Sequence, residues 1–142
     1  MYKLIEIKNS AVTRELVLEN LNTLTIDVCF DDSMLVGKSG YKFLKTNDIY
    51  LCKIVLFDAR IDLDGEEFYV NKRISIGKKQ MFEVINLIGD IYYLLSENFS
   101  SYPLGEKISV HYTRKDLMQV NNFVNEKWTR NWDTEVILDN YT

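Results

Sequence analysis

The sequence predicts an α+β domain in which a mostly antiparallel sheet packs against two helices, in the order ββββαβαβ. Three observations support this fold class. The first half of the chain contains runs of β-branched and aromatic residues, an Asp64-Gly65 pair separates two of these runs, and a helical period begins at Lys79. The 142 residues suffice for one hydrophobic core, so we expect residues 1–142 to form a single globular domain.

The first two strands are expected at residues 2–8 and 24–30. Residues 2–8 mix isoleucine and leucine with polar residues in short alternation. Residues 24–30 alternate strictly, which is typical of a half-buried strand. The two faces of that strand carry Leu24, Ile26, Val28 and Phe30 on one side and Thr25, Asp27 and Cys29 on the other. Residues 31–48 contain aspartates and two glycines, which indicates a long connection.

The third and fourth strands are expected at residues 49–61 and 68–76. Both segments are rich in β-branched and aromatic residues. Asp64-Gly65 lies between them, and this dipeptide is a strong signal for a tight hairpin turn because such turns need positive φ angles. We therefore expect these two strands to be antiparallel neighbours.

Two helices and two further strands are expected in the second half. Residues 79–98 have polar residues at three- and four-residue steps opposite a wide apolar face. That face consists of Met81, Val84, Ile85, Ile88, Ile91, Tyr92 and Leu95. Residues 107–112 are expected to form a strand. Thr113 and Asp116 resemble a capping box, which predicts a second helix from Thr113 through Lys127. A last strand is expected at residues 134–138.

A partly open barrel of the OB type is the alternative fold. Three long strands followed by a helix and further strands match the chain order of that barrel. This is an analogy of fold, and it carries no function by itself.

Two segments resemble a phosphate-binding loop and a calcium-binding loop, but neither segment contains all the residues that its motif requires. Gly37, Lys38 and Ser39 match the end of a phosphate loop, but Asp32 stands where its first glycine must be. Residues 60–71 have aspartates at two positions of a calcium loop, but a cation replaces the first carboxylate and the terminal bidentate glutamate is missing.

A single histidine, His111, also rules out the paired histidines of common zinc hydrolase motifs. We therefore expect no catalytic residue, no metal and no cofactor, and we expect the protein not to be an enzyme. Cys29 and Cys52 lie in apolar stretches, where free thiols behave as small buried hydrophobic groups.

The composition disfavours a nucleic-acid partner and a membrane location. The net charge of −4 opposes general binding to phosphate backbones, although it leaves room for a local basic patch. No apolar run approaches the roughly 20 residues that span a bilayer, and the opening residues lack the order of a secretory signal. We expect a cytoplasmic protein.

The expected function is binding of another protein. Small acidic single-domain proteins include the bacterial immunity proteins that neutralise toxins, which often present acidic surface to basic nuclease sites. Only this general character supports the comparison, since no motif does. The acidic candidates for such a surface are Asp31, Asp32, Asp62, Asp64, Glu66 and Glu67.

The alternative function is an OB-like module that binds single-stranded nucleic acid or an oligosaccharide. Cations interleaved with aromatic rings are typical of single-strand grooves, and the long connection has this pattern. Lys78 and Lys79 would add an anion-binding point at the start of the first helix. The candidates for this alternative are Lys38, Tyr41, Lys42, Phe43, Lys45, Lys78 and Lys79.

Overall fold

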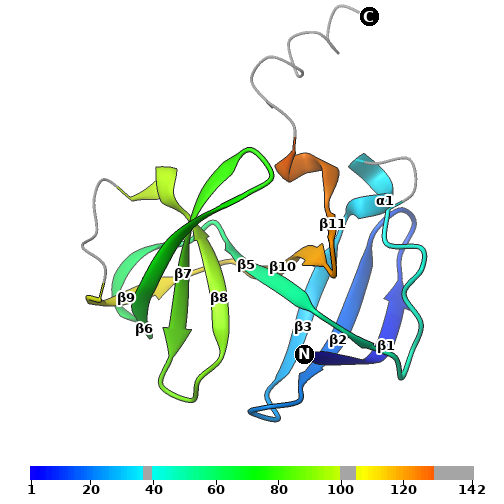
Figure 1. Ribbon diagram of the computed structural model, residues 1–142, viewed down its shortest axis with the longest axis horizontal. Helices are drawn as coiled ribbons and strands as arrows, with labels where there is room; N and C mark the ends of the chain where they lie inside the picture. The colour runs from blue at the N-terminus through cyan, green and yellow to red at the C-terminus, as the bar shows by residue number, and fades with distance from the viewer. Residues whose placement is uncertain (37–39, 100–104, 130–142) are drawn as a thin grey trace, which may run out of the picture.

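The protein is built almost entirely from β-strands (Figure 1). The computed structural model describes residues 1–36, 40–99 and 105–129. In these ranges eleven strands form one mixed sheet in the order β4-β1-β2-β3-β10-β5-β8-β7-β6-β9, with β11 paired to β10. The strands are β1 (Tyr2–Asn9), β2 (Arg14–Asn20), β3 (Ile26–Asp31), β4 (Ile49–Tyr50), β5 (Cys52–Phe57), β6 (Arg60–Ile76), β7 (Lys79–Asn86), β8 (Ile91–Leu95), β9 (Lys107–His111), β10 (Arg114–Val120) and β11 (Phe123–Val124).

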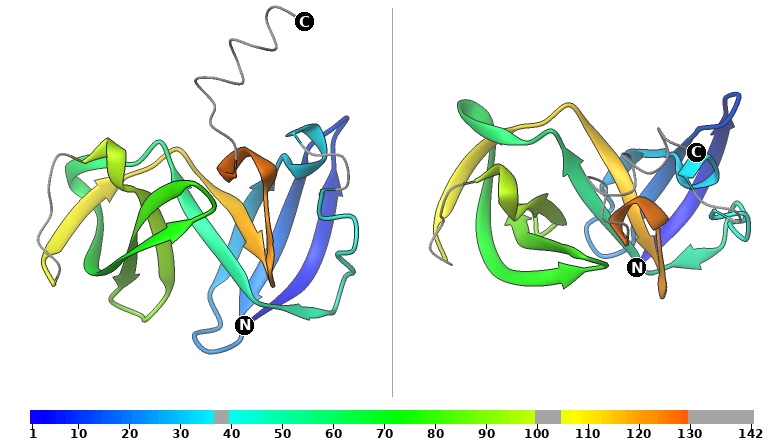
Figure 2. Two further views of the ribbon diagram at one scale, coloured as in Figure 1. Left: turned by 45° about the horizontal axis from the view of Figure 1, so that its top comes forward. Right: turned by 90° about the horizontal axis from the view of Figure 1, so that it is seen from above.

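The strands gather into two lobes joined by one pair of strands (Figures 1 and 2). The first lobe contains β1 to β4, and the second lobe contains β6 to β9. Between them, β5 and β10 pair antiparallel, from Phe57 opposite Arg114 to Cys52 opposite Val120. On either side of this pair the contact is parallel, since β10 joins β3 and β5 joins β8.

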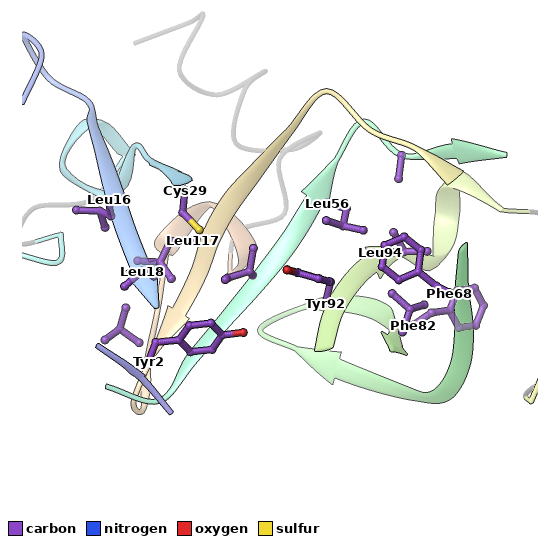
Figure 3. Packing of buried hydrophobic residues seen from close by; sticks show 14 of the residues in the cluster. Tyr2, Leu16, Leu18, Cys29, Leu56, Phe68, Phe82, Tyr92, Leu94 and Leu117 are labelled. Carbon is purple, nitrogen blue, oxygen red and sulfur yellow. The ribbon is translucent and has the colours of Figure 1, made fainter. Parts of the chain in front are cut away.

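One continuous apolar core runs through both lobes (Figure 3). In the first lobe it contains Leu16 and Leu18 of β2, and in the second lobe Phe68 of β6 and Phe82 of β7. A smaller cluster covers the opposite face of the central strands, and its members are Val55, Ile76, Met81, Tyr93, Met118 and Trp128. Because apolar side chains cover both faces, the central strands are buried on both sides.

The predicted α+β class with two helices is wrong. Helical structure in the described ranges is limited to α1 (Ser33–Val36) and two short 3-10 helices, η1 (Ser96–Asn98) and η2 (Glu126–Trp128). Residues 79–98, the expected first helix, form mainly the hairpin of β7 and β8. Residues 113–127, the expected second helix, form β10, β11 and part of η2.

The OB-like barrel is also wrong. The OB barrel has five strands, whereas the described residues form one mixed sheet of eleven strands. The strand expected at residues 134–138 lies outside the described residues.

The expected hairpin at Asp64-Gly65 is wrong as well. Both residues lie inside the single long strand β6, and β5 does not pair with β6. The residues between Ile61 and Glu66 bulge out of the ladder, since both of these residues pair with Val110 of β9. The tight turns of this lobe lie instead between β6 and β7 and between β7 and β8.

The strand predicted at residues 24–30 is confirmed as β3. Its apolar side was expected to face the core, but the buried side is the one that carries Asp27 and Cys29. Asp27 and Cys29 are buried, whereas Ile26 and Val28 are about half exposed. The alternation was therefore read correctly, but the polar side of the strand faces inward.

Candidate functional site

Two of the six acidic candidates, Asp31 and Asp32, form ion pairs with basic residues of the same chain. Asp31 is buried, forms a 2.6 Å ion pair with Arg14 and accepts a hydrogen bond from the backbone N–H of Ser33. Asp32 forms a 2.8 Å ion pair with Lys127 and accepts from the side chain of Asn125. Since both charges are balanced internally, these two carboxylates are poor candidates for contact with a partner.

The other four acidic candidates lie together on the second lobe, at and beside the bulge of β6. Asp62 accepts a hydrogen bond from the backbone N–H of Asp64, which fixes the tip of the bulge. A Cβ atom at Gly65 would lie 2.3 Å from the carbonyl oxygen of Val110, so only glycine lets the bulge pack this closely on β9. Leu63, which lies between Asp62 and Asp64 in this bulge, is 95% exposed to solvent.

The turn between β7 and β8 adds apolar side chains beside these acids. A hollow of about 320 Å³ is lined by Glu66, Glu67, Asn86, Leu87 and Ile88. Leu87 is 74% exposed and Ile88 is 68% exposed. We call the combined region the acidic-apolar surface, and it consists of Asp62, Leu63, Asp64, Glu66, Glu67, Leu87 and Ile88.

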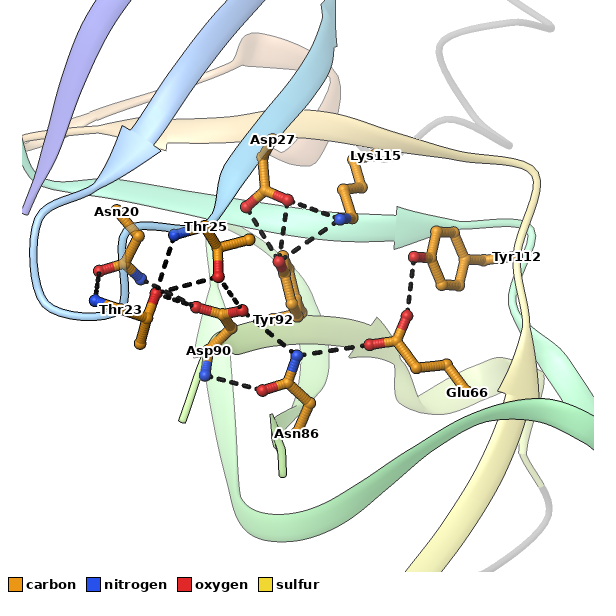
Figure 4. A network of polar contacts seen from close by, with 10 residues as sticks. All are labelled: Asn20, Thr23, Thr25, Asp27, Glu66, Asn86, Asp90, Tyr92, Tyr112 and Lys115. Atoms are coloured by element: carbon orange, nitrogen blue, oxygen red, sulfur yellow. Dashed lines mark hydrogen bonds and ion pairs between the residues drawn. The ribbon is translucent and has the colours of Figure 1, made fainter. Parts of the chain in front are cut away.

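Hydrogen bonds hold this turn in place (Figure 4). The side-chain oxygen of Asn86 accepts from the backbone N–H groups of Ile88, Gly89 and Asp90. The amide group of Asn86 donates to Glu66 at 3.4 Å, and Glu66 also accepts from the hydroxyl of Tyr112. The apolar residues of the surface therefore stand on an ordered turn, so a partner would lose little entropy in fixing them.

Asp90 connects the same turn to the first lobe (Figure 4). Its buried carboxylate accepts from the hydroxyls of Thr23 at 2.5 Å and Thr25 at 2.7 Å, and from the side-chain amide of Asn20 at 3.3 Å. These three donors come from the end of β2 and the turn that follows it. Asp90 therefore fastens the two lobes to each other.

A second polar contact between the lobes is formed by Asp27, Tyr92 and Lys115 (Figure 4). The Lys115 ammonium lies 2.5 Å from Asp27, and the Tyr92 hydroxyl donates to the same carboxylate at 2.9 Å. Burial and the charge of Asp27 raise the pKa of Tyr92, so its hydroxyl stays protonated. Burial lowers the pKa of Lys115, but the hydrogen bond and charge of Asp27 outweigh this effect and raise it overall. Neither group has the lowered pKa of a general base or nucleophile at neutral pH, so the cluster is suited to holding strands together.

Of the candidates for the alternative function, Tyr41 is buried, whereas Phe43 is 37% exposed. The hydroxyl of Tyr41 donates to the carbonyl oxygen of Met118 at 2.7 Å. Phe43 packs against the rings of Tyr41, Tyr50 and Phe123. Lys42 and Lys45 are exposed. Lys38 lies outside the described residues.

Lys78 and Lys79 were expected to bind an anion at the start of a helix, but no helix begins at these residues. Lys79 opens strand β7, and Lys78 lies in the tight turn before it. The backbone N–H of Lys78 donates to the carbonyl oxygen of Trp128. That N–H group is therefore not available to an anion.

His111 is exposed at the end of β9, opposite Arg60 of β6. In the part of the chain that the structure describes, no group of three or more histidine, cysteine, aspartate or glutamate side chains could hold a metal ion. Over the same residues, no helix has the length and apolar character needed to cross a bilayer.

The apolar members of the acidic-apolar surface were missed at the sequence level. Ile88 was expected on the apolar face of a helix, and Leu63 and Leu87 were not among the candidates. The segment Asn86-Leu87-Ile88-Gly89-Asp90 contains the residue types of a tight turn, and this signal could have identified the hairpin. In comparisons with known proteins, no family model matches this chain, and no curated protein or solved structure is significantly similar to it.

Proposed function

We propose that the protein is a non-catalytic protein-binding domain whose partner contacts the acidic-apolar surface of the second lobe. The exposure of three large apolar side chains, Leu63, Leu87 and Ile88, supports this most directly. Exposed apolar groups rimmed by charged residues are typical of interaction sites. Glu66 and Glu67 provide that rim, since they line the same hollow as Leu87 and Ile88.

The charge of this surface defines the chemistry of the partner. Asp62, Asp64, Glu66 and Glu67 carry four carboxylates, and Lys107, at 3.3 Å from Glu67, is the cation paired with them among the described residues. A basic surface with an apolar centre would therefore be steered toward this lobe. A toxin with a basic nuclease site is one such partner, so the specific candidate is a toxin-neutralising immunity protein.

The proposed setting is the cytoplasm. Cys29 and Cys52 are free thiols, and proteins of oxidising compartments more often carry their cysteines as disulfides. The acidic composition is compatible with the same setting.

The test of the apolar contact uses two residues of equal exposure. The wild-type chain is used to capture its partner from the native cell, and the dissociation constant is then measured for Ile88→Asp and Leu24→Asp. Both residues are 68% exposed, but Leu24 lies on the first lobe and has a φ angle of 64°, which aspartate tolerates. We expect Ile88→Asp to weaken binding at least tenfold, by about 1.4 kcal/mol or more, and Leu24→Asp to leave it unchanged. Equal effects of the two variants would refute the proposed surface.

A charge reversal tests the electrostatic part separately. Glu67→Lys on the second lobe and Glu6→Lys on the first lobe change the net charge by the same amount, and both glutamates are exposed. We expect Glu67→Lys to slow association with a basic partner, more strongly at low salt, and Glu6→Lys to have a smaller effect. An association rate that neither variant changes would contradict the basic character of the partner.

Binding of single-stranded nucleic acid through residues 38–45 stays a prediction of the sequence. The OB barrel on which that alternative drew is not formed, and Tyr41 is buried. Titration with single-stranded DNA at low salt distinguishes it from protein binding. Affinity that falls steeply with salt and is lost in Lys42→Glu would favour the nucleic-acid function.

A further inference from the structure

A cavity of about 400 Å³ lies where the two lobes meet. Its wall combines the chain start, the end of β2 with the turn after it, the beginning of β5, the turn between β7 and β8, strand β8, and the end of β10 with the turn that follows. Small-molecule sites have volumes of roughly 300–1,000 Å³ and often lie between structural units. The size and position of this cavity therefore suit a small ligand.

The charge of the cavity wall is opposite in sign to that of the whole protein. The chain has a net charge of −4, yet no aspartate or glutamate lines the cavity, and Lys53 is its one charged side chain. Among the described residues no carboxylate pairs with Lys53, whose ammonium lies 5.8 Å from the centre of the Tyr93 ring. The nearby carboxylate of Asp90 is already engaged by hydroxyl and amide donors. Lys53 thus contributes to the cavity wall a positive charge that forms no direct ion pair with a described carboxylate.

The rest of the wall offers a ring and several amides. Tyr93 donates its hydroxyl to Glu83 at 3.0 Å, so its contribution to the cavity is the ring. Gln119 donates to the carbonyl oxygen of Asn121 at 2.8 Å, which leaves the Gln119 side-chain oxygen as an acceptor. The side chain of Asn122 forms no hydrogen bond with the described residues, so both its donor and its acceptor groups are free.

One part of this wall is held in an unusual backbone conformation. Asn121 has a φ angle of 52°, in the left-handed region. Two hydrogen bonds with Leu51 fix it, since the Asn121 side chain accepts from the Leu51 N–H and the Asn121 N–H donates to the Leu51 carbonyl oxygen. Asparagine adopts this conformation readily in tight turns, and Asn121 lies in the turn between β10 and β11. The backbone of the turn at Asn121 is consequently fixed before any ligand arrives.

We propose that this cavity binds a small carboxylic acid that also carries hydroxyl groups, such as a sugar acid. The carboxylate would pair with Lys53, the apolar face of the ligand would lie on Tyr93, and its hydroxyls would bond to Gln119 and Asn122. A single lysine suits one negative charge, whereas a phosphate dianion is usually held by several cations or backbone N–H groups. The site shares no residue with the acidic-apolar surface, so either proposal can fail without the other.

The test is an NMR titration of the full chain, labelled with ¹⁵N, with three probes. D-Glucuronate has both the carboxylate and the hydroxyls, D-glucose lacks the charge, and benzoate lacks the hydroxyls. We expect saturable shifts at Lys53, Tyr93, Gln119 and Asn122 with glucuronate, at a Kd of about 1 mM for so small a ligand, and weaker binding of both comparison probes. Shifts that do not saturate, or that scatter away from the cavity, would overturn the proposal.

Variants of the charged residue make the test specific. Lys53→Met should weaken glucuronate binding at least tenfold and bring it close to that of glucose, while Lys53→Arg should keep most of it. Lys42→Met removes an exposed lysine outside the cavity and should change nothing. The ¹⁵N spectrum of each variant reports whether it is folded. Equal binding by wild type and a folded Lys53→Met variant would refute the assigned ligand class.

Discussion

Asp27 occupies a strand position that alternation alone would leave facing solvent. Its side chain is only 1% exposed, and it is balanced by the ammonium of Lys115 and the hydroxyl of Tyr92. A buried charge of this kind is tolerated only while its partners remain, because the carboxylate has lost its hydration. The two partners therefore determine which face of β3 points inward.

Because Asp27 is buried, replacing it should strongly lower the free energy of unfolding. Asp27→Asn leaves Lys115 without its counter-ion, and breaking buried pairs costs about 3–5 kcal/mol; Lys115 keeps some contact with water, so we expect about 3 kcal/mol. Urea denaturation at pH 7 measures the change in the free energy of unfolding. Glu67→Gln, which breaks the exposed pair with Lys107, is the control and should cost less than about 0.5 kcal/mol. Similar losses for both variants would show that the buried pair has no special role.

The same residue explains what could be predicted from the sequence at this scale. The period of two in residues 24–30 correctly predicted a strand. Its buried face was wrongly assigned because Lys115 lies 88 residues further along the chain and Tyr92 lies 65 residues further. Four of the acidic candidates lie close together because they are near one another in the sequence. The exposure of Leu63 could not be predicted, because it depends on a bulge that forms against β9, more than 40 residues further along the chain.

At the scale of elements, β7 explains why a strand was taken for a helix. Four consecutive residues, from Met81 to Val84, are buried, because one apolar cluster covers each face of the strand. Alternation disappears in a strand that is buried on both sides, and spacings of three and four residues then arise by chance. The glycine at position 89, with a φ angle of 105°, belongs to the turn that divides the supposed helix.

The turn between β6 and β7 gives a test of packing between elements. Gly77 has a φ angle of 58°, and a Cβ there would lie 2.3 Å from the carbonyl oxygen of Trp128. Gly105 has a φ angle of 86° and open space around it. Both glycine-to-alanine changes should lower the free energy of unfolding by about 1 kcal/mol, because alanine is strained at a positive φ angle. Gly77→Ala should lower it by about 2 kcal/mol more, because η2 must move to make room for the Cβ atom.

Thermal and urea denaturation of the two glycine variants measure this difference. Near-ultraviolet circular dichroism adds a second readout, since displacement of η2 would change the surroundings of the buried Trp128. Equal stability of Gly77→Ala and Gly105→Ala would mean that η2 does not press on this turn.

At the scale of the whole molecule, the junction between the lobes depends on Asp90 as well as on β5 and β10. Asp90→Ala removes the acceptor of three side-chain donors in the first lobe. Each hydrogen bond to a charged group contributes about 1.5–3 kcal/mol, so the loss of three such bonds should cost about 4.5 kcal/mol or more. Asp48→Ala is the control, because that side chain is exposed.

Hydrogen exchange locates the effect of the Asp90 variant. We expect faster exchange at residues 20–25 and 86–90 than in the core strands, since the two turns are released from each other before the sheet opens. A uniform increase over the whole chain would mean that Asp90 supports global stability without acting as a latch between the lobes.

Stability should fall steeply in alkali because many acidic protons are buried. Burial raises the pKa of Tyr2, Tyr41, Tyr92, Tyr93, Cys29 and Cys52, that of Cys52 to about 12. The unfolded chain loses these protons near pH 9 for the thiols and pH 10 for the phenols, while the folded protein keeps them. Above these values the unfolded state binds fewer protons, so each group removes about 1.4 kcal/mol of stability per pH unit.

Urea denaturation between pH 7 and pH 11, with reductant present, measures this dependence. The thiols act first, and by pH 11 the summed loss should approach the roughly 5–15 kcal/mol that stabilise a typical domain. The double variant Cys29→Ala and Cys52→Ala should delay the decline until the phenols ionise near pH 10. Stability that stays constant through pH 10.5 would mean that the unfolded chain shields these groups as well as the core does, or that the core admits water.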